Sequence, residues 1–222
     1  MEPDNPLLDD YILAQAETEE PAICFLGTAS GDSAEYIAKF YNAFNRRPCR
    51  PRHLPLFRQP DDLAGFVRSC DIIYVGGGNT RNAMAIWKAS GMETLLREAW
   101  ENGTVLCGLS AGAICWFEQG LTDSEGALTA MDCLGFLRGS CTPHYDGEPG
   151  RRPAYERFVG AGKLSDGYAI DDSAALHFVD EAEPVAVSSV PNVKAYSVRR
   201  ASGGVHEEAL ETRFLGAAPD AL

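Results

Sequence analysis

The sequence predicts an α/β fold of three layers, with a mostly parallel central sheet and helices on both of its faces. Through the first half of the chain, short apolar runs that end in glycine alternate with helix-like stretches, the order typical of a parallel sheet. The run at 71–75 is almost uninterrupted in apolar residues, which favours a strand covered on both faces. A length of 222 residues suits one domain, so we expect 1–222 to form a single domain with about 20 peripheral residues at its start and about 10 at its end.

The first half divides into alternating strands and helices. In chain order they are a strand at 22–27, a helix ending near Phe44, an edge strand at 51–56, a helix at 61–68, a strand at 71–75, helices at 81–90 and 93–102, and a strand at 104–106. Ser30 or Asp32 fits the cap of the first helix, because such side chains accept hydrogen bonds from the free N–H groups of a first turn. The prolines within 51–56 cannot donate to a neighbouring strand, which favours the edge of the sheet.

The second half contains shorter apolar runs that are separated by glycines. They lie at 135–139, 174–179, 185–187 and 195–198, and we interpret them as hairpin strands that complete the sheet. Loops at the carboxyl ends of parallel strands gather at one edge of a sheet. The glycine-rich loops after the strands at 71–75 and 104–106 should therefore meet there.

The composition argues against several classes of function. The formal net charge of -13 repels nucleic-acid phosphates, and no cluster of basic residues offsets it. The four histidines and seven cysteines show no zinc-ligand spacing, so we expect neither a metal nor a cofactor. Scattered cysteines, an acidic start and the lack of an apolar run of about 18 residues predict a cytoplasmic protein that does not engage a membrane.

A glycine-flanked serine is the strongest chemical signal in the chain. The segment 108–112 reads Gly-Leu-Ser-Ala-Gly and follows the apolar strand directly. A strand that enters a helix through one tight turn needs Gly108 and Gly112 to make room, and it leaves Ser110 exposed at the turn. We therefore predict that Ser110 is a nucleophile.

The triple glycine at 76–78 matches no nucleotide-binding motif. We expect its N–H groups at Gly77 and Gly78, together with the N–H of Ala111 after the serine, to stabilise an oxyanion. Close passage of the loop past a helix is the alternative explanation for these glycines.

A serine nucleophile needs a histidine base. His144 lies on a loop rich in turn-forming residues, where catalytic groups commonly lie, and is preferred over His177 in an apolar run. The orienting acid is open between Asp123 and Glu125, which precede the histidine, and Asp146, which follows it.

Three segments together resemble a known family. Val75-Gly76-Gly77-Gly78-Asn79-Thr80, Gly108-Leu109-Ser110-Ala111-Gly112-Ala113 and the pair Pro143-His144 are similar to peptidase E, the α-aspartyl dipeptidase family that also includes cyanophycinase-like enzymes. The resemblance implies a serine peptidase on a class I glutamine-amidotransferase-like fold, with serine in place of the amidotransferase cysteine. It assigns Ser110 as nucleophile, His144 as base and an acid between them, at Glu125 or, with an alignment shift of two, at Asp123.

The resemblance also implies the substrate. We expect a small peptide, cleaved as by a dipeptidase that prefers an N-terminal aspartyl residue. Its side chain would need a cation, and Arg151, Arg152, Arg157 or Arg81 could supply one. We therefore expect four residues to bind the substrate: Asn79, Thr80, Arg151 and Arg152.

Departures from the family pattern leave alternatives open. The segments Trp116-Phe117-Glu118 and 144–148 indicate a separate subgroup, for which a strict preference for an N-terminal aspartate is not required. A serine amidase or esterase acting on a non-peptide substrate would use the same residues, and a non-catalytic small-molecule binding domain could keep the same loops. The oligomeric state is open, with a homodimer as one option.

Overall fold

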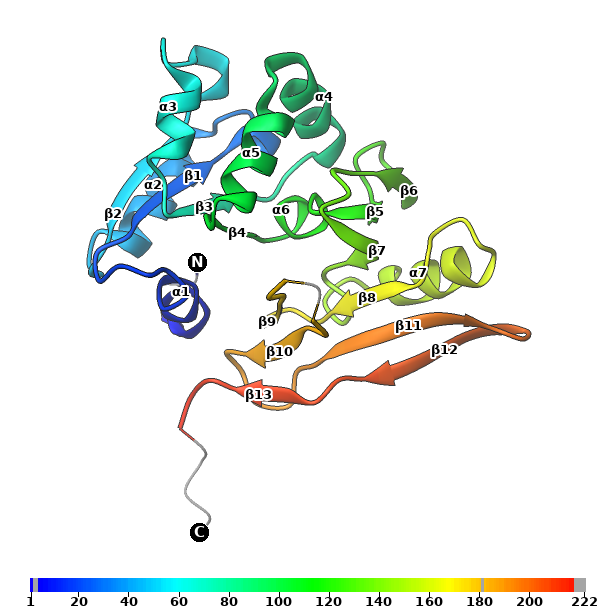
Figure 1. Ribbon diagram of the computed structural model, residues 1–222. Coiled ribbons are helices and arrows are strands. Elements are labelled where there is room, and N and C mark those ends of the chain that lie inside the picture. The colour runs from blue at the N-terminus through cyan, green and yellow to red at the C-terminus, as the bar shows by residue number, and fades with distance from the viewer. Residues whose placement is uncertain (2–3, 181, 218–222) are drawn as a thin grey trace.

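A parallel four-stranded sheet forms the first half of the molecule (Figure 1). The computed structural model describes residues 1, 4–180 and 182–217. From one edge to the other, the strands are β2 (Arg50–His53), β1 (Ala22–Leu26), β3 (Ile72–Val75) and β4 (Val105–Gly108). All three pairings in this sheet are parallel.

Alternating side chains build a core on each face of this sheet. Cys24 and Leu26 of β1 lie in one apolar cluster, while Ile23 and Phe25 lie in the other, as the two-residue period of a strand requires. The helices that pack into the first cluster are α3 (Leu63–Arg68), α4 (Thr80–Ser90) and α5 (Met92–Glu101). Those that pack into the second are α1 (Leu7–Leu13) and α2 (Ala34–Phe44). The strands are therefore buried on both sides.

A mixed six-stranded sheet forms most of the second half. Its order is β12 (Gly204–Ala209), β11 (Ala195–Ala201), β8 (Gly167–Ile170), β7 (Leu137–Thr142), β5 (Phe117–Thr122) and β6 (Thr129–Asp132). The central strands β5, β7 and β8 are parallel, and the outer strands are antiparallel to their neighbours. The short helix α6 (Ala111–Ile114) joins the two halves, and α7 (Arg151–Gly160) packs on β11 and β12 (Figure 1).

A small third sheet lies beside these strands. Its order is β13 (Thr212–Phe214), β10 (Val185–Ser188) and β9 (Ala174–His177). The start of the chain reaches this sheet through two hydrogen bonds. The Tyr11 hydroxyl of α1 lies 2.9 Å from His177 Nδ1, and Asn5, before α1, donates to the Ser189 carbonyl just after β10 over 2.9 Å. The start of the chain is thereby tied to both halves.

The α/β architecture with helices on both faces of a parallel sheet is confirmed, and several details differ. The first long helix is capped by Ser33, whose hydroxyl accepts from the Tyr36 N–H, because residues 28–30 form a separate 3-10 turn; the predicted caps Ser30 and Asp32 are wrong. The run at 135–139 overlaps β7, which has parallel neighbours on both sides and is not a hairpin strand.

Other elements were not predicted: α1, α7, β5, β6, β8, β12 and β13. Within the described ranges, no helix has the length and apolar character needed to cross a membrane. The expectation of a peripheral end falls partly on 218–222, which lie outside the described residues.

Candidate active site

Ser110 occupies a strained turn between β4 and α6. Its backbone φ of 55° and ψ of -118° are unusual for a residue with a side chain. The neighbouring glycines allow this turn, because a Cβ on Gly112 would collide with the Val75 carbonyl oxygen and a Cβ on Gly108 would collide with the Gly112 carbonyl. The Leu109 N–H donates to that same Val75 carbonyl over 3.2 Å. The fold thus accepts local strain to present one serine side chain.

The glycine loop after β3 lies directly against this serine. A Cβ on Gly77 would stand 3.0 Å from Ser110 Cβ and 3.5 Å from its Oγ. Gly78 has a φ of 135° and passes so close to the Ala29 carbonyl that a side chain would clash. Both positions therefore require glycine for steric reasons.

The three expected oxyanion donors differ in their availability. The Gly77 N–H already donates to the Tyr36 hydroxyl oxygen over 3.0 Å. In the described part of the chain, no acceptor contacts the N–H of Gly78, and the N–H of Ala111 stands at the first position of α6, where a helix offers it no partner. Gly78 and Ala111 are thus the two N–H groups open to a ligand.

Asn79 and Thr80 use their side chains within the protein. Asn79 caps α4, since its Oδ1 accepts from the Asn82 N–H over 2.9 Å and its Nδ2 donates to the Ser124 carbonyl. Thr80 is 2% exposed, and its hydroxyl accepts from Thr122 over 3.4 Å. Both side chains are therefore hydrogen-bonded within the protein, and their expected contact with a substrate stays a prediction.

His144 is hydrogen-bonded to a carboxylate that the sequence did not single out. The loop after β7 holds His144 at a φ of 58°, and its Nδ1 lies 2.6 Å from Asp172 Oδ1. Asp172 follows β8, which pairs in parallel with β7, so the two strands deliver both side chains to one edge. With the Nδ1 proton donated to the carboxylate, Nε2 is left as an acceptor.

Of the three acids expected from the sequence, Glu125 and Asp146 have side-chain partners other than His144. Glu125 forms an ion pair with Arg81 at 2.6 Å. The Asp123 carbonyl closes a turn with the Gly126 N–H. Asp146 Oδ1 accepts from the Asp172 backbone N–H over 2.8 Å, so Asp146 holds the loop of the acid that contacts His144. That acid comes after the histidine in the chain, whereas the resemblance implied one before it.

Asp172 was missed because β8 was not predicted. The signal available in the sequence was the polar pair Asp171-Asp172 directly after the apolar segment 168–170. Such a pair at the end of a parallel strand adjacent to the histidine strand would have been a candidate. Without the strand order, nothing linked it to His144.

Two other histidines have partners of their own. His53 Nδ1 lies 2.9 Å from the Tyr41 hydroxyl, and His177 Nδ1 contacts Tyr11. Burial lowers the pKa of His177 below its ordinary value, which favours the neutral ring. Among the described residues, no group of three or more His, Cys, Asp or Glu could hold a metal ion.

Arg151 and Arg152 are both engaged in contacts with the protein. Arg151 is 4% exposed, binds the Glu148 carboxylate through two nitrogens and donates to the Leu121 carbonyl over 3.2 Å. Arg152 pairs with Glu207 and lies over the rings of Tyr145 and Tyr196 at 5.1 and 5.4 Å. These contacts anchor α7 to the second sheet and leave neither guanidinium unpaired.

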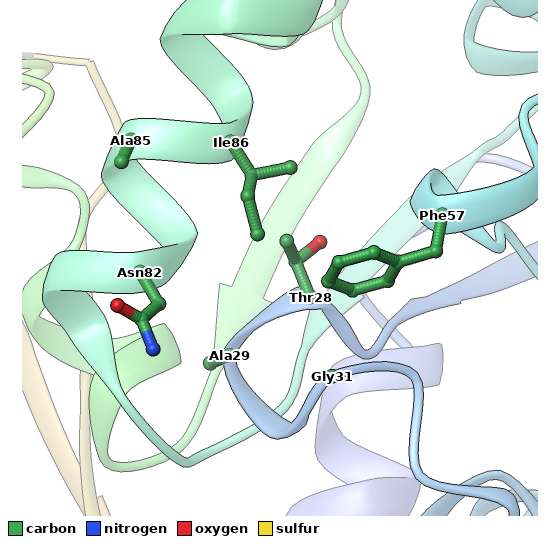
Figure 2. Close-up of a pocket in the computed structure, with 7 residues that line it drawn as sticks. All are labelled: Thr28, Ala29, Gly31, Phe57, Asn82, Ala85 and Ile86. Carbon is green, nitrogen blue, oxygen red and sulfur yellow. The ribbon is translucent and has the colours of Figure 1, made fainter.

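A cavity of about 270 Å³ lies behind the Gly78 turn. Figure 2 shows Phe57, Asn82 and Ile86 around Thr28, between the 3-10 turn at 28–30 and α4. The Thr28 hydroxyl accepts from Trp87 Nε1 over 3.0 Å. The Ala29 carbonyl lies against the Gly78 turn, and neither Gly78 nor Ser110 is among the residues that line this cavity.

Comparison with known proteins points to one family of enzymes. The sequence model of Peptidase family S51 matches residues 1–184. The uncharacterized peptidase YgaJ of Bacillus subtilis (strain 168) is 55% identical over 217 residues, which cover 97% of this chain and 94% of the relative. The uncharacterized peptidase Lin0382 of Listeria innocua is 32% identical over 96 residues, covering 40% of this chain and 46% of the relative.

Two solved structures share the fold. A candidate peptidase E protein from Listeria monocytogenes EGD-e superposes with a TM-score of 0.62 at 21% identity, covering 80% of this chain and 91% of that one. A peptidase from an acI-B1 Actinobacterium superposes with a TM-score of 0.71 at 18% identity, covering 93% and 89%. The overall arrangement of strands and helices is thus that of these structures.

Proposed function

Because the chain belongs to Peptidase family S51 and is a serine-type peptidase, we propose that it hydrolyses short peptides through an acyl-enzyme on Ser110, with His144 as base and Asp172 as the orienting acid. The single observation that carries this assignment is the 2.6 Å hydrogen bond between His144 Nδ1 and Asp172 Oδ1. It leaves Nε2 as the only ring nitrogen that could take a proton from a nucleophile.

The proposed reaction follows from these roles. Ser110 Oγ attacks the peptide carbonyl carbon while its proton passes to His144 Nε2. The tetrahedral oxyanion accepts hydrogen bonds from the Gly78 and Ala111 N–H groups, each contributing about 3 to 4 kcal/mol of barrier lowering. His144 then gives its proton to the leaving amine, and the C–N bond breaks. Water attacks the acyl-enzyme with the same base, which releases the acid and restores the Ser110 hydroxyl.

Tyr36 adds a feature that the sequence did not indicate. Its hydroxyl oxygen accepts from the Gly77 N–H, so Gly77 acts in this proposal through the loop geometry and not as an oxyanion donor. Burial raises the pKa of the Tyr36 phenol above its ordinary value, which keeps its proton in place at neutral pH.

Cleavage of dipeptides with a preference for an N-terminal aspartyl residue is the finer part of the proposal. All three arginines have a carboxylate partner, but the Arg81 side chain is more exposed than those of Arg151 and Arg152, so we assign Arg81 as the cation for an aspartyl carboxylate. It is 63% exposed and stands two residues after Asn79, at the start of α4. A substrate carboxylate would compete with Glu125 for it.

The test uses a serine-directed covalent reagent and a dipeptide panel with varied first residues. Wild type and a control variant, Ser90→Ala at the distant end of α4, should be labelled and active, while Ser110→Ala should be neither. Labelling with cleavage of esters but no peptide would favour the esterase or amidase alternative. Absence of labelling in folded wild type would favour a binding domain and would sink the proposal.

A further inference from the structure

A second, larger cavity runs along α2 toward the serine turn. Its volume is about 760 Å³. It is lined by Met1, Ser33, Glu35, Tyr36, Ala38, Lys39, Asn42, Ala43 and Leu109. None of these residues was expected to bind substrate from the sequence.

One end of this cavity lies against the proposed reaction centre. Leu109 directly precedes Ser110, and its side chain would be 3.2 Å from a Cβ on Gly77. Tyr36 contacts the same loop, since its hydroxyl accepts from the Gly77 N–H. A peptide bound at Ser110 could therefore place the residue on one side of its scissile bond in this cavity.

The cavity carries a cation without an ion-pair partner. Lys39 is exposed on the face of α2 that lines it, and no salt bridge to Lys39 is found within the described ranges. Arg81, in contrast, is paired with Glu125. Glu35, one helical turn before Lys39, lines the cavity too and is likewise outside any salt bridge in that part of the chain.

The spacing along α2 suits a single residue of peptide. Tyr36 and Lys39 are three residues apart on one helix face, which corresponds to about 4.5 Å along the axis. One extended residue spans about 3.3 to 3.6 Å. A dipeptide whose scissile carbonyl lies beside the Gly77 loop, which Tyr36 contacts, would place its C-terminal carboxylate about one residue further on, toward Lys39.

We propose that this cavity is the subsite for the leaving residue of a dipeptide, and that Lys39 determines specificity by binding its free C-terminal carboxylate. The inference rests on the proposed peptidase function and adds a recognition residue to it. A longer peptide places its carboxylate at least one residue further away, so the same contact disfavours it. The Glu35 carboxylate repels the substrate carboxylate. The cavity therefore attracts a substrate carboxylate only where that group contacts Lys39.

The experiment measures binding by calorimetry to the Ser110→Ala variant, which needs no turnover. The probes are aspartyl-leucine and alanyl-leucine, each as the free acid and as the C-terminal amide. We expect the acids to bind more tightly than the amides. Adding Lys39→Gln should weaken acid binding about 10- to 100-fold, the effect of losing one charged hydrogen bond, and leave amide binding unchanged. Lys39→Arg should retain most of the acid preference.

Two controls make the result specific. Glu35→Gln should strengthen acid binding, the opposite sign to Lys39→Gln, and Lys88→Gln on α4 should change nothing. Equal binding of acids and amides, no binding of either, or an unchanged acid preference in Lys39→Gln would overturn the subsite. Failure of the peptidase function is seen separately, as absent labelling and cleavage in wild type while this binding pattern persists.

Discussion

Replacing Asp172 by asparagine tests the central geometry of the site. The substitution keeps the size of the side chain and removes the charge that faces His144 Nδ1 at 2.6 Å. An amide no longer stabilises the imidazolium and can hold the ring in the tautomer whose Nε2 carries a proton. We expect kcat for dipeptide hydrolysis to fall about 10³-fold, equivalent to about 4 kcal/mol of barrier. This is less than for a buried acid, because the Asp172 side chain is 54% exposed and water screens its charge.

The control for this prediction is Glu125→Gln. It breaks only an ion pair whose side chains are 63% and 52% exposed, a type of contact worth about 0 to 1 kcal/mol. Its kcat should stay within about fivefold of wild type, because this pair takes no part in the proposed chemistry, and any effect of releasing Arg81 should appear in KM. Steady-state kinetics with melting curves of both variants separate activity from folding. If Glu125→Gln lost as much activity as Asp172→Asn, or more, the assignment of the acid would be refuted.

Three further outcomes follow from the contacts around the site. Gly112→Ala should lower the melting temperature, at a cost of about 1 to 3 kcal/mol, because the new Cβ meets the Val75 carbonyl; an unchanged melting curve would contradict the steric reading. Tyr36→Phe leaves the Gly77 N–H without its acceptor, so the free energy of unfolding measured in urea should fall by about 1 to 3 kcal/mol. An unchanged free energy of unfolding would mean that water replaces the hydroxyl as the acceptor. The folded state lowers the pKa of His177, so as the pH drops the histidine is protonated first in the unfolded state, and the free energy of unfolding should fall as the pH drops through about 6.5. His177→Gln should flatten that part of the curve of stability against pH. An identical slope in the variant would exclude His177 as the cause.

Several features of the fold were predictable because they are local. The strand at 72–75 is apolar on both sides, and the structure buries all four of its residues. The glycines at 108 and 112 flank a serine because the turn brings backbone within collision distance of Val75 and of itself. The residues that specify each of these features lie within a few positions of one another, so the sequence alone could predict the features.

Other features were not predictable because they depend on distant partners. Ser33 caps α2 only because residues 28–30 first form a separate turn. Arg151 donates hydrogen bonds to the Leu121 carbonyl, 30 residues earlier in the chain, and to the Glu148 carboxylate. Neither outcome follows from the identity of the residue. A serine can cap a helix at many positions, and an arginine side chain is usually exposed to solvent.

The sequence by itself determined the alternation of strands and helices, the strained turn around Ser110 and the glycine loop that lies beside it. Each of these is specified by residues that are close in the chain and by steric limits on their backbone. Only the tertiary structure decided which carboxylate faces His144. The contact with Asp172 spans 28 residues and exists because β7 and β8 pair in parallel, so that their carboxyl ends meet at one edge. It likewise decided that the Gly77 N–H donates to Tyr36, because α2 packs across β1 and β3 and brings a side chain 41 residues away against the loop.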